Sequence, residues 1–364
     1  MNFIVKDFES LLSHFKLEGE IKGITPLGSG LINDTYCVET VSPDTPNYVL
    51  QRINHAVFQD VELLQNNIWL VTNHIKKKLK EEGVQDITRR VLTLIKTTDD
   101  KTYWFDGKSY WRVTILISDA TTLQAVNPES SYYAGSAFGQ FEYQLADLEE
   151  PLGDTIPNFH NMEFRIEEFK EALKKNKVNR IDEVQDIIDE IEKRAEEMCM
   201  AERLHREGKL PKRICHGDSK VNNILFDEEG NVLCVIDLDT TMPNFIFSDY
   251  GDFLRTGANT TQEDDPDLNQ VSFNMDIFKS FTKGYLESAK AFLTPIEIEN
   301  LPFAVKLFPY MQCVRFLTDY INGDTYYKIE YPTHNLVRTK NQLRLLECVE
   351  DSYGAIQDYI NQQL

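Results

Sequence analysis

The 364-residue sequence has few features suited to membrane insertion or secretion. No apolar run approaches the roughly 20 residues that a membrane-spanning helix needs. The segment 1–7 also lacks the basic region followed by an apolar core that is typical of a secretory signal. We therefore expect a cytoplasmic protein with no membrane partner.

Positive charge is scarce as well. The 38 lysines and arginines are outnumbered by 59 acidic residues, which gives a formal net charge of −21 and an isoelectric point near 4.8. Proteins that bind nucleic acid or anionic membranes normally present a basic face. This balance argues against a nucleic-acid partner, although local basic residues can still bind ATP.

Cysteines are few, and none forms a CxxC pair typical of zinc sites or thioredoxin-like sites. Several of them lie in apolar runs, which suits small buried hydrophobic residues in a reducing compartment. We expect free thiols at all six positions, which are Cys37, Cys199, Cys215, Cys234, Cys313 and Cys348.

A sizeable hydrophobic core is nevertheless possible, because 41% of the residues are hydrophobic and the chain is long. The N-terminal third alternates between short strand patterns and one helical pattern, including an Asp106-Gly107 hairpin signal. From residue 129 onward the pattern is helical. We expect an α+β enzyme with a small antiparallel sheet and one main helix in residues 1–117, and a larger, mostly helical lobe in residues 118–364.

The most informative stretch runs from Ile214 to Phe226 and contains the pattern His-x-Asp-x-x-x-x-Asn. Fourteen residues after Asn223, Asp237 follows a second apolar run. Phosphoryl transfer needs a carboxylate that orients the attacking hydroxyl and oxygen ligands that hold Mg²⁺ against the nucleotide phosphates. The pattern predicts Asp218 as the catalytic carboxylate, with Asn223 and Asp237 as the Mg²⁺ ligands.

Nucleotide-binding candidates precede this stretch. Gly28 and Gly30 flank Ser29 between two strand patterns, where backbone amides can approach phosphate oxygens, and Asn33 lies at the start of the return strand. The backbone near Ile117 is a candidate for hydrogen bonds with adenine. Gln51 stands where a kinase-like lobe usually carries a lysine, and Arg52 points to the opposite strand face.

Two further polar residues are expected to have structural roles. His160 lies in a polar segment between helical patterns, and we expect a surface or capping histidine. Asp249 is expected to cap the helix that starts there and to brace the catalytic loop by accepting backbone amides.

Together these residues resemble the aminoglycoside phosphotransferase and choline kinase superfamily, which has a protein-kinase-like two-lobed fold. Within it, the pattern is similar to the group of N-acetylhexosamine 1-kinases. The similarity extends over most of the chain, in the blocks 28–33, 48–54, 135–139, 214–226, 236–240, 316–320 and 334–339.

The resemblance implies ATP- and Mg²⁺-dependent phosphorylation of the anomeric C1 hydroxyl of N-acetylglucosamine or N-acetylgalactosamine. It implies that Asp218 is the base and that Arg315 and Tyr326 contact the sugar. An ordinary aspartate, with a pKa of about 3.9 in water, is a weak base for an alcohol, so Asp218 should take the proton late in the transfer. The anomeric hydroxyl is the most acidic on the ring and suits such a base.

Two alternatives remain from the sequence alone. The superfamily motifs and the acidic composition also suit a kinase for an amino alcohol or an aminoglycoside. Gln51 in place of the lysine raises the alternative of a non-catalytic, nucleotide-binding pseudokinase. The intact Asp218, Asn223 and Asp237 favour an active enzyme.

Overall fold

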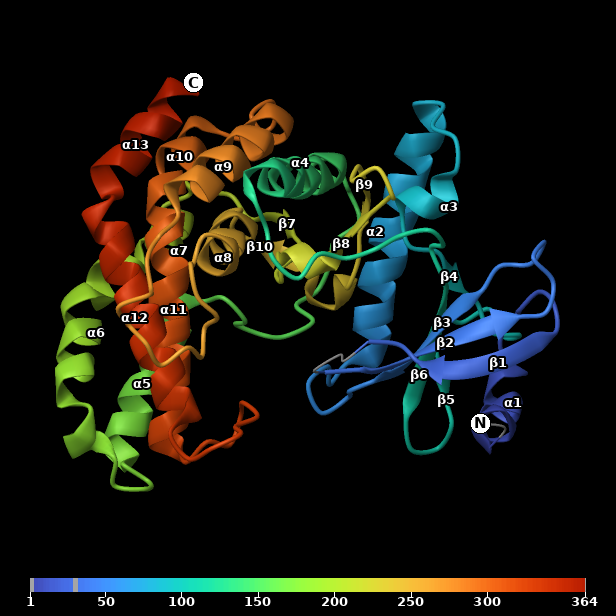
Figure 1. The fold of residues 1–364 in the computed structure, drawn as a ribbon, viewed down its shortest axis with the longest axis horizontal. Coiled ribbons are helices and arrows are strands. Elements are labelled where there is room, and N and C mark those ends of the chain that lie inside the picture. The colour runs from blue at the N-terminus through green and yellow to red at the C-terminus, as the bar shows by residue number, and fades with distance from the viewer. Residues whose placement is uncertain (1–2, 29–31, 364) are drawn as a thin grey trace. The chain divides into compact units, whose positions relative to one another are not determined.

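The computed structural model describes residues 3–28 and 32–363, and the chain folds into two compact units (Figure 1). Unit 1 comprises Met1–Thr122, Asp147–Pro157 and Ile224–Met242. Unit 2 comprises Leu123–Ala146, Asn158–Asn223 and Pro243–Leu364. Each unit is therefore assembled from segments that are distant in the sequence. The lobe boundary after residue 117 stays a prediction.

Unit 1 is built on an antiparallel sheet in the order β1-β2-β3-β6-β4, with β5 paired to β6. The bounds are β1 Ile21–Pro26, β2 Asp34–Thr40, β3 Tyr48–Ile53, β4 Leu94–Ile95, β5 Trp104–Phe105 and β6 Tyr110–Ile115. Alternate residues Tyr48 and Leu50 face the core, as the two-residue period of a strand requires. At the predicted hairpin, the Asp106 carboxylate accepts the backbone N–H of Lys108 and Ser109 at 2.8 and 2.7 Å.

The main helix of unit 1 is α2, Val61–Glu81. The Asp60 side chain caps it by accepting the backbone N–H of Leu63. The residues that form its apolar stripe recur every three or four positions and are buried: Val61, Leu64, Ile68, Val71, Ile75 and Leu79. Unit 1 also contains α1 (Phe3–Leu12), α3 (Ile87–Arg90), β8 (Ile224–Phe226), β9 (Val232–Val235) and the 3₁₀ turn η3 (Leu238–Thr240).

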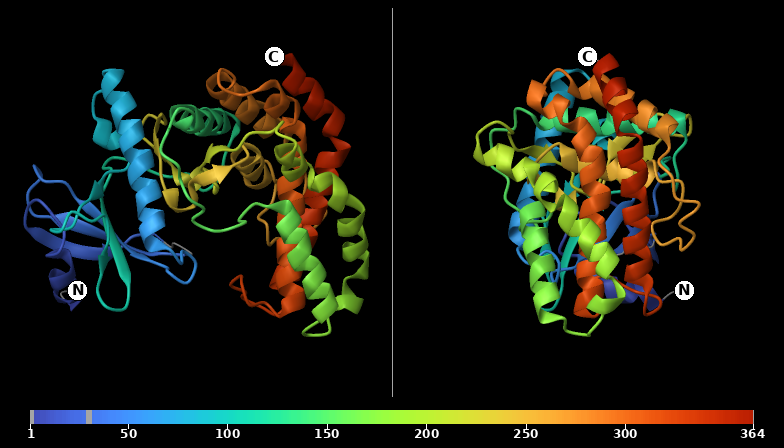
Figure 2. Two further views of the ribbon diagram at one scale, coloured as in Figure 1. Left: turned by 180° about the vertical axis from the view of Figure 1, so that it is seen from behind. Right: turned by 90° about the vertical axis from the view of Figure 1, so that its left-hand side faces the viewer.

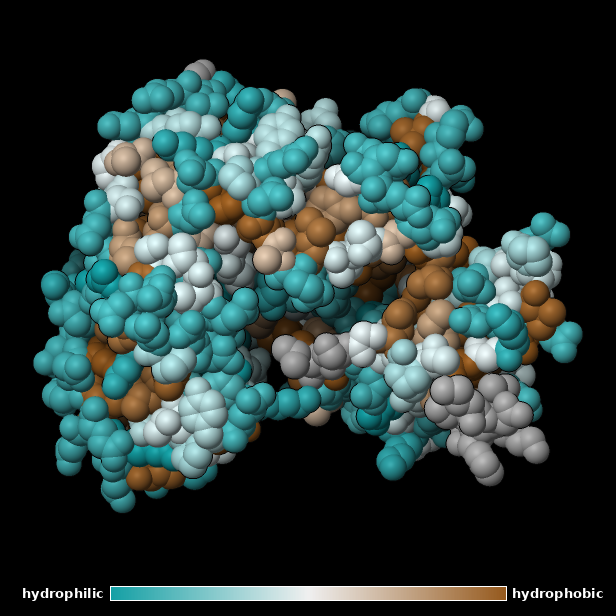
Figure 3. Space-filling view, viewed as in Figure 1, coloured by the Kyte–Doolittle hydropathy of each residue, from teal (hydrophilic) through white to brown (hydrophobic). Residues whose placement is uncertain are grey.

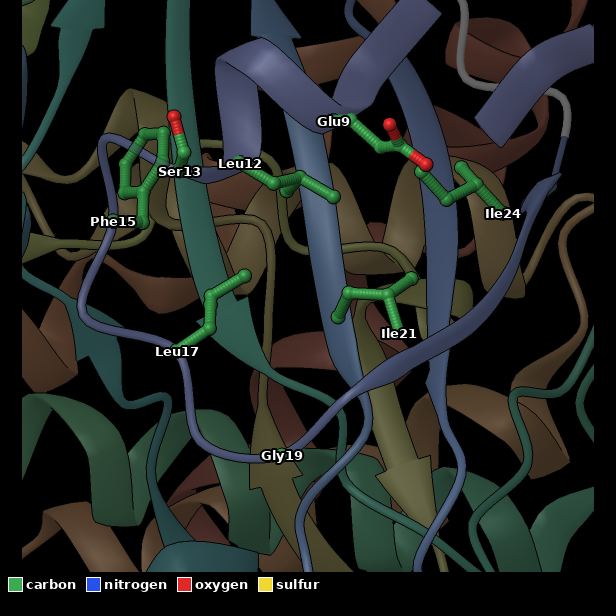
Figure 4. A pocket seen from close by; sticks show the side chains of 8 residues that line it. All are labelled: Glu9, Leu12, Ser13, Phe15, Leu17, Gly19, Ile21 and Ile24. Atoms are coloured by element: carbon green, nitrogen blue, oxygen red, sulfur yellow. The ribbon is translucent and has the colours of Figure 1, made fainter. Parts of the chain in front are cut away.

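Unit 1 also has a small pocket of about 250 Å³ between the end of α1 and β1 (Figure 4). Apolar side chains dominate its lining, which comprises Glu9, Leu12, Ser13, Phe15, Leu17, Gly19, Ile21 and Ile24. None of the residues predicted for catalysis or binding lines this pocket. It carries no arrangement of groups suited to phosphoryl transfer.

Unit 2 is mostly helical, as predicted. Its helices are α4 (Pro128–Leu145), α5 (Met162–Lys175), α6 (Gln185–Met198), α7 (Met200–Arg206), α8 (Phe247–Gly257), α9 (Met275–Ala289), α10 (Pro295–Glu299), α11 (Leu301–Asn322), α12 (His334–Asp351) and α13 (Tyr353–Gln362). The short elements are η1 (Ile181–Glu183), β7 (Arg213–Cys215), η2 (Val221–Asn223) and β10 (Met242–Asn244). The helical segments 185–206 and 334–362 are interrupted at Cys199 and Ser352, respectively.

The long helix α11 forms the centre of unit 2. It packs against α5, α8 and α12, and α12 runs alongside it (Figure 1, Figure 2). Nearly all of its residues are buried, so hydrophobic side chains surround it instead of forming one stripe.

Helices α4 and α9 approach each other closely through glycine. A Cβ atom built on Gly135 would lie 2.1 Å from the carbonyl oxygen of Phe281, and one on Gly284 would lie 2.0 Å from that of Tyr132. Only glycine permits this backbone separation. The close approach brings the side chains on the facing surfaces of α4 and α9 together, including residues behind the catalytic loop.

Hydrophilic side chains cover much of the visible face of unit 2 (Figure 3), in agreement with the acidic composition. Within residues 3–28 and 32–363, every helix falls short of the length or the apolar character that crossing a membrane demands. All six cysteines are free thiols, as predicted.

Candidate active site

The predicted catalytic loop connects β7 to η2 within unit 2. Cys215, at the end of β7, is fully buried, and Gly217 takes φ +80°, in the left-handed region that favours glycine. The turn at Gly217 redirects the chain, so that the side chain of Asp218 remains 29% exposed next to the buried His216. A short strand with a buried end, β7, is thus followed by the accessible carboxylate of Asp218.

Asp218 and Asn223 lie together, as their spacing predicts. The Asn223 Nδ2 group donates to the backbone oxygen of Asp218 at 2.8 Å and to its Oδ2 at 3.2 Å. The Lys220 ammonium lies 2.7 Å from Asp218 Oδ1. These two donors fix the direction of the carboxylate, and the side-chain oxygen of Asn223 is left as the group that can face a cation.

Lys220 is part of a larger charged cluster. Burial opposes the charge of Lys220, but the carboxylates of Asp218 and Asp252 outweigh it and raise the pKa of the ammonium. The buried Arg255 pairs with Asp252 at 2.8 Å and with Glu263 at 2.9 Å. Lys220 therefore remains a cation next to the predicted base.

Asp249 braces the catalytic loop, as predicted. Its carboxylate accepts the backbone N–H of His216 at 2.6 Å and of Gly217 at 2.7 Å, and its backbone oxygen accepts the Ser219 hydroxyl at 2.7 Å. The expected helix cap is wrong. Helix α8 begins two residues earlier, at Phe247, so Asp249 lies inside its first turn and points to the loop instead.

His160 is a core residue, so the expectation of a surface or capping position is wrong. It is 8% exposed, its Nδ1 lies 3.0 Å from the Ser248 hydroxyl, and its ring stacks on Phe159. The cap of α5 comes from Asn161 instead. Burial, followed by the charges of Arg315 and Arg165, lowers the pKa of His160 well below its ordinary value. The imidazole is therefore neutral.

Arg315 projects from α11 among aromatic rings. Its guanidinium lies 5.3 Å from the ring centre of Phe159, 5.9 Å from that of Tyr326 and 5.7 Å from that of Tyr327. Its side chain donates to Gln312 at 3.1 Å, and it forms no ion pair with any residue that the structure describes. Arg315 and Tyr326 are thus neighbours, and their contact with a sugar stays a prediction.

A buried carboxylate shapes the segment that carries these tyrosines. Asp319 accepts the backbone N–H of Thr325, Tyr326 and Tyr327 at 2.8, 2.9 and 3.0 Å. Tyr326 is 63% exposed, whereas the hydroxyl of Tyr327 is buried without a hydrogen-bond partner in the described part of the chain. Asp319 therefore fixes the position of both rings next to Arg315.

The predicted metal ligand Asp237 belongs to unit 1 and directly follows the β8–β9 hairpin. Its backbone has φ 61° and ψ 58°, a left-handed conformation that aspartate tolerates better than most residues. This conformation turns the chain away from the direction of β9, and the 3₁₀ turn η3 begins at the next residue. The role of Asp237 as a ligand stays a prediction.

Two residues after Asp237, Asp239 forms a buried network that the sequence did not reveal. It pairs with Arg112 of β6, and the two side chains are 4% and 5% exposed. Asn33 Nδ2 donates to Asp239 at 2.6 Å, and Arg112 Nε donates to Gln51 Oε1 at 2.9 Å. The network joins the loop that carries Asp237 to the sheet of unit 1. Gln51 thus orients an arginine on the adjacent strand.

The remaining nucleotide-binding candidates all belong to unit 1. Gly28 adopts φ +69°, a conformation that favours glycine, while Ser29 and Gly30 lie outside the described residues. Asn33 is buried, and its side chain also accepts the backbone N–H of Asn54 at 2.9 Å. Ile117 is buried with Leu233 and Cys234. Contacts of these residues with nucleotide stay predictions.

The residues proposed for Mg²⁺ fit that ion chemically. Mg²⁺ prefers oxygen ligands, and Asn223 and Asp237 supply an amide oxygen and a carboxylate. The amide nitrogen of Asn223 is already bound to Asp218, which is the orientation that a ligand through the side-chain oxygen needs. When bound, Mg²⁺ would neutralise charge on the nucleotide phosphates.

Sequence reasoning missed three polar residues that hold these loops: Arg112, Asp239 and Glu142. Glu142 lies on the apolar face of α4 between Phe138 and Leu145, and it is 1% exposed. A charged residue within an apolar stripe was the available signal. Arg112 carries the same signal within a buried strand.

The fold and the two sets of loops define a small-molecule kinase with a protein-kinase-like architecture. The chain belongs to the phosphotransferase enzyme family, whose model matches residues 23–277. The predicted superfamily and fold class are therefore confirmed.

Solved structures with the same fold are similar over nearly the whole chain. An aminoglycoside phosphotransferase from Alicyclobacillus acidocaldarius has 13% sequence identity and a TM-score of 0.61, with 95% of each chain covered. A spectinomycin phosphotransferase in complex with ADP and spectinomycin has 14% identity and a TM-score of 0.57, covering 99% of this chain and 98% of its own. An ethanolamine kinase from Plasmodium vivax has 13% identity and a TM-score of 0.51, with 88% of this chain and 82% of its own covered.

Proposed function

We propose that this chain transfers the γ-phosphoryl group of ATP to the anomeric C1 hydroxyl of N-acetylglucosamine or N-acetylgalactosamine and so produces the sugar 1-phosphate. Family membership supports phosphoryl transfer to a small molecule. The observation that carries the choice of acceptor is the charge and aromatic character of the group around Arg315.

This group is unsuited to a cationic acceptor. Arg315 has no carboxylate partner in the described chain, and its neighbour Arg165 is paired with Glu168 at 2.6 Å. An amino alcohol or an aminoglycoside carries positive charge, which Arg315 would repel. A neutral sugar avoids that repulsion. Its hydroxyl and acetamido oxygens can accept from the guanidinium, and an aromatic ring such as that of Tyr326 can pack on its apolar face.

Asp218 has the geometry of an orienting carboxylate. Lys220 and Asn223 donate to its two oxygens and hold them in a fixed direction. The acceptor hydroxyl would bind to the carboxylate and pass its proton to Asp218 as the bond between the γ-phosphorus and the ADP oxygen breaks. Such positioning can supply much of the rate acceleration in phosphoryl transfer. Asn223 and Asp237 would hold the Mg²⁺ that shields the phosphates.

The test is incubation with ATP, Mg²⁺ and each N-acetylhexosamine, followed by ³¹P and ¹H NMR of the product. We expect phosphate on C1. Asp218→Asn should lower kcat by about 10²- to 10⁴-fold, while the exposed residue change Asp276→Asn on α9 serves as the matched control. Phosphate on another hydroxyl, or no turnover of any hexosamine, would refute the proposal.

Arg315→Lys tests the acceptor site itself. Lysine keeps the charge but loses the planar set of donors, so KM for the sugar should rise while KM for ATP stays unchanged. Arg344→Lys, at a half-exposed ion pair on α12, is the control. Equal effects of the two changes on KM for the sugar would exclude Arg315 from sugar binding.

A second candidate is a kinase of amino alcohols or aminoglycosides, which the ethanolamine kinase and the aminoglycoside phosphotransferase with the same fold support. Ethanolamine and a panel of aminoglycosides should then compete with the sugars and carry the phosphate. A pseudokinase would show the same slow ATP turnover with Asp218→Asn as with the unmodified chain.

A further inference from the structure

Two acidic side chains are buried face to face behind the catalytic loop. Glu142 of α4 is 1% exposed and Asp249 of α8 is 0% exposed. Tyr285 of α9, also 0% exposed, completes the group. The close approach of α4 and α9 at Gly135 and Gly284 places Glu142 and Tyr285 within hydrogen-bonding distance.

The donors in this group are unequally distributed. Asp249 receives two backbone N–H groups, from His216 and Gly217. Glu142 Oε2 receives only the Tyr285 hydroxyl, at 2.5 Å. The other oxygen of Glu142, Oε1, has no donor among the described groups, although the Glu142 and Asp249 side chains are in contact. One donor is therefore missing between the two acids.

A proton supplies that donor. Oxygens of the two acids lie within 4.8 Å of each other in a fully buried site, where two negative charges repel strongly. Arg213, whose charge interacts with Glu142, is engaged by Glu297 at 2.9 Å. Because two amides stabilise the anionic form of Asp249, the proton belongs on Glu142. Burial, followed by the charge of Asp249, raises the pKa of Glu142 well above its ordinary value.

A metal ion would compete with this proton for the same contact. Cys215 lies with Glu142 and Asp249 in a group that has the spacing of metal ligands. The Cys215 thiol, however, donates to the backbone oxygen of Phe245 at 3.3 Å, and burial raises its pKa well above the ordinary value. The thiol is therefore protonated in this environment, and a metal ion would have to displace its proton to bind there.

We propose that Glu142 is a protonated positioning residue, which donates from Oε1 to Asp249 and thereby holds the His216–Gly217 backbone that presents Asp218. The catalytic part of this proposal rests on the proposed phosphotransferase function. The protonation state of Glu142 does not.

A protonated Glu142 makes the catalytic loop sensitive to rising pH. The groups that interact with Glu142 are Asp249 from α8, Tyr285 from α9, the Cys215 thiol at the end of β7, and the Glu297–Arg213 pair of α10 and β7. His216 interacts with Asp249. Loss of the Glu142 proton would add a second carboxylate charge next to Asp249. The clamp on the catalytic loop would then weaken.

The sign of the stability effect follows from the raised pKa. An unfolded glutamate titrates near pH ~4.3, whereas folded Glu142 keeps its proton at higher pH. As pH rises from this value towards the folded pKa, the native state loses stability relative to Glu142→Gln, which carries no charge. The ratio of the two unfolding constants should change by up to about tenfold per pH unit in that window.

Infrared difference spectroscopy tests the proton without any assay of turnover. At pH 6, where an ordinary glutamate with a pKa of about 4.3 is ionised, subtraction of the Glu142→Gln spectrum from that of the unmodified chain should leave the C=O band of a protonated carboxylic acid. The control is Glu287→Gln on α9, because Glu287 accepts the Tyr132 hydroxyl at the same 2.5 Å but is exposed. Its difference spectrum should show carboxylate bands only. Carboxylate bands for Glu142 as well would overturn the proposal.

Kinetics test the positioning role. Glu142→Gln keeps a donor and an acceptor, so its kcat should stay close to that of the unmodified chain, without the decline that loss of the Glu142 proton causes at higher pH. Glu142→Ala removes the donor and should lower kcat by about 10- to 100-fold. Equal losses in the two variants, or the same decline of kcat with rising pH in Glu142→Gln as in the unmodified chain, would refute the positioning role. If no acceptor is turned over, the infrared result still decides the protonation state.

Discussion

The buried pair of Arg112 and Asp239 offers a sharp test of what holds the Asp237 loop in place. Asp239→Leu would remove the acceptor of Arg112 and of Asn33 Nδ2. The Arg112 guanidinium would remain buried, and its Nε would still donate to Gln51 Oε1. Loss of one partner from a buried ion pair costs about 3–5 kcal/mol, because the other charge stays out of water.

The adjacent strand supplies a matched control. Arg52 of β3 pairs with Asp34 of β2, but both side chains are 48% exposed. Water solvates either charge when the other is removed, so Asp34→Leu should cost less than about 1 kcal/mol. The chemical change is identical in the two variants, and burial is the main difference between them.

Tryptophan fluorescence during urea unfolding is a suitable assay. All three tryptophans, Trp69, Trp104 and Trp111, belong to unit 1, so their emission reports the unit that contains the pair. This matters because two-state analysis is safer for one unit than for a chain of two. The free energy of unfolding should fall by about 3–5 kcal/mol for Asp239→Leu.

The double variant Arg112→Met/Asp239→Leu separates the causes. If the cost comes from an unpaired buried charge, removal of both charges should restore most of the lost stability. The reasoning is wrong if Asp239→Leu costs no more than Asp34→Leu. It is equally wrong if the losses of the two single variants simply add in the double variant.

Three further predictions concern other parts of the chain. Asp237→Asn should lower Mg²⁺-dependent turnover by at least about 10-fold. The Tm of the ligand-free chain should stay nearly unchanged, since asparagine also tolerates φ 61°. A large drop in Tm would contradict the prediction that Asp237 acts as a metal ligand without a structural role. Gly135→Ala should destabilise unit 2 by about 3 kcal/mol or more, because its Cβ would meet the Phe281 backbone at 2.1 Å. Circular dichroism during thermal unfolding measures this loss of stability. A change below about 1 kcal/mol would speak against the close packing of the two helices. Because the pKa of His160 is lowered, the native state should lose stability as pH falls below about 6.5, the ordinary histidine value. His160→Asn should reduce that loss, measured as the difference between the unfolding free energies from urea titrations at pH 5 and 7. An unchanged difference would exclude His160 as its source.

The sequence by itself determined the class of chemistry and most of the secondary structure. Asp218 and Asn223 lie five positions apart on one short loop, so local geometry brings them together. The α2 stripe and the Asp106-Gly107 hairpin also depend on interactions between near neighbours. Such local patterns survive in a single sequence because periodicity and turn chemistry act over a few residues.

Tertiary structure decided how the polar groups around those loops are paired. Asp239 finds Arg112 and Asn33, which are 127 and 206 positions away, and Glu142 lies against Asp249. No local pattern encodes such partners. Each residue is polar within an apolar environment, and burial forces it to find a donor, an acceptor or a proton wherever the fold supplies one. For the same reason His160 is a neutral core residue, although its surroundings in the sequence are polar.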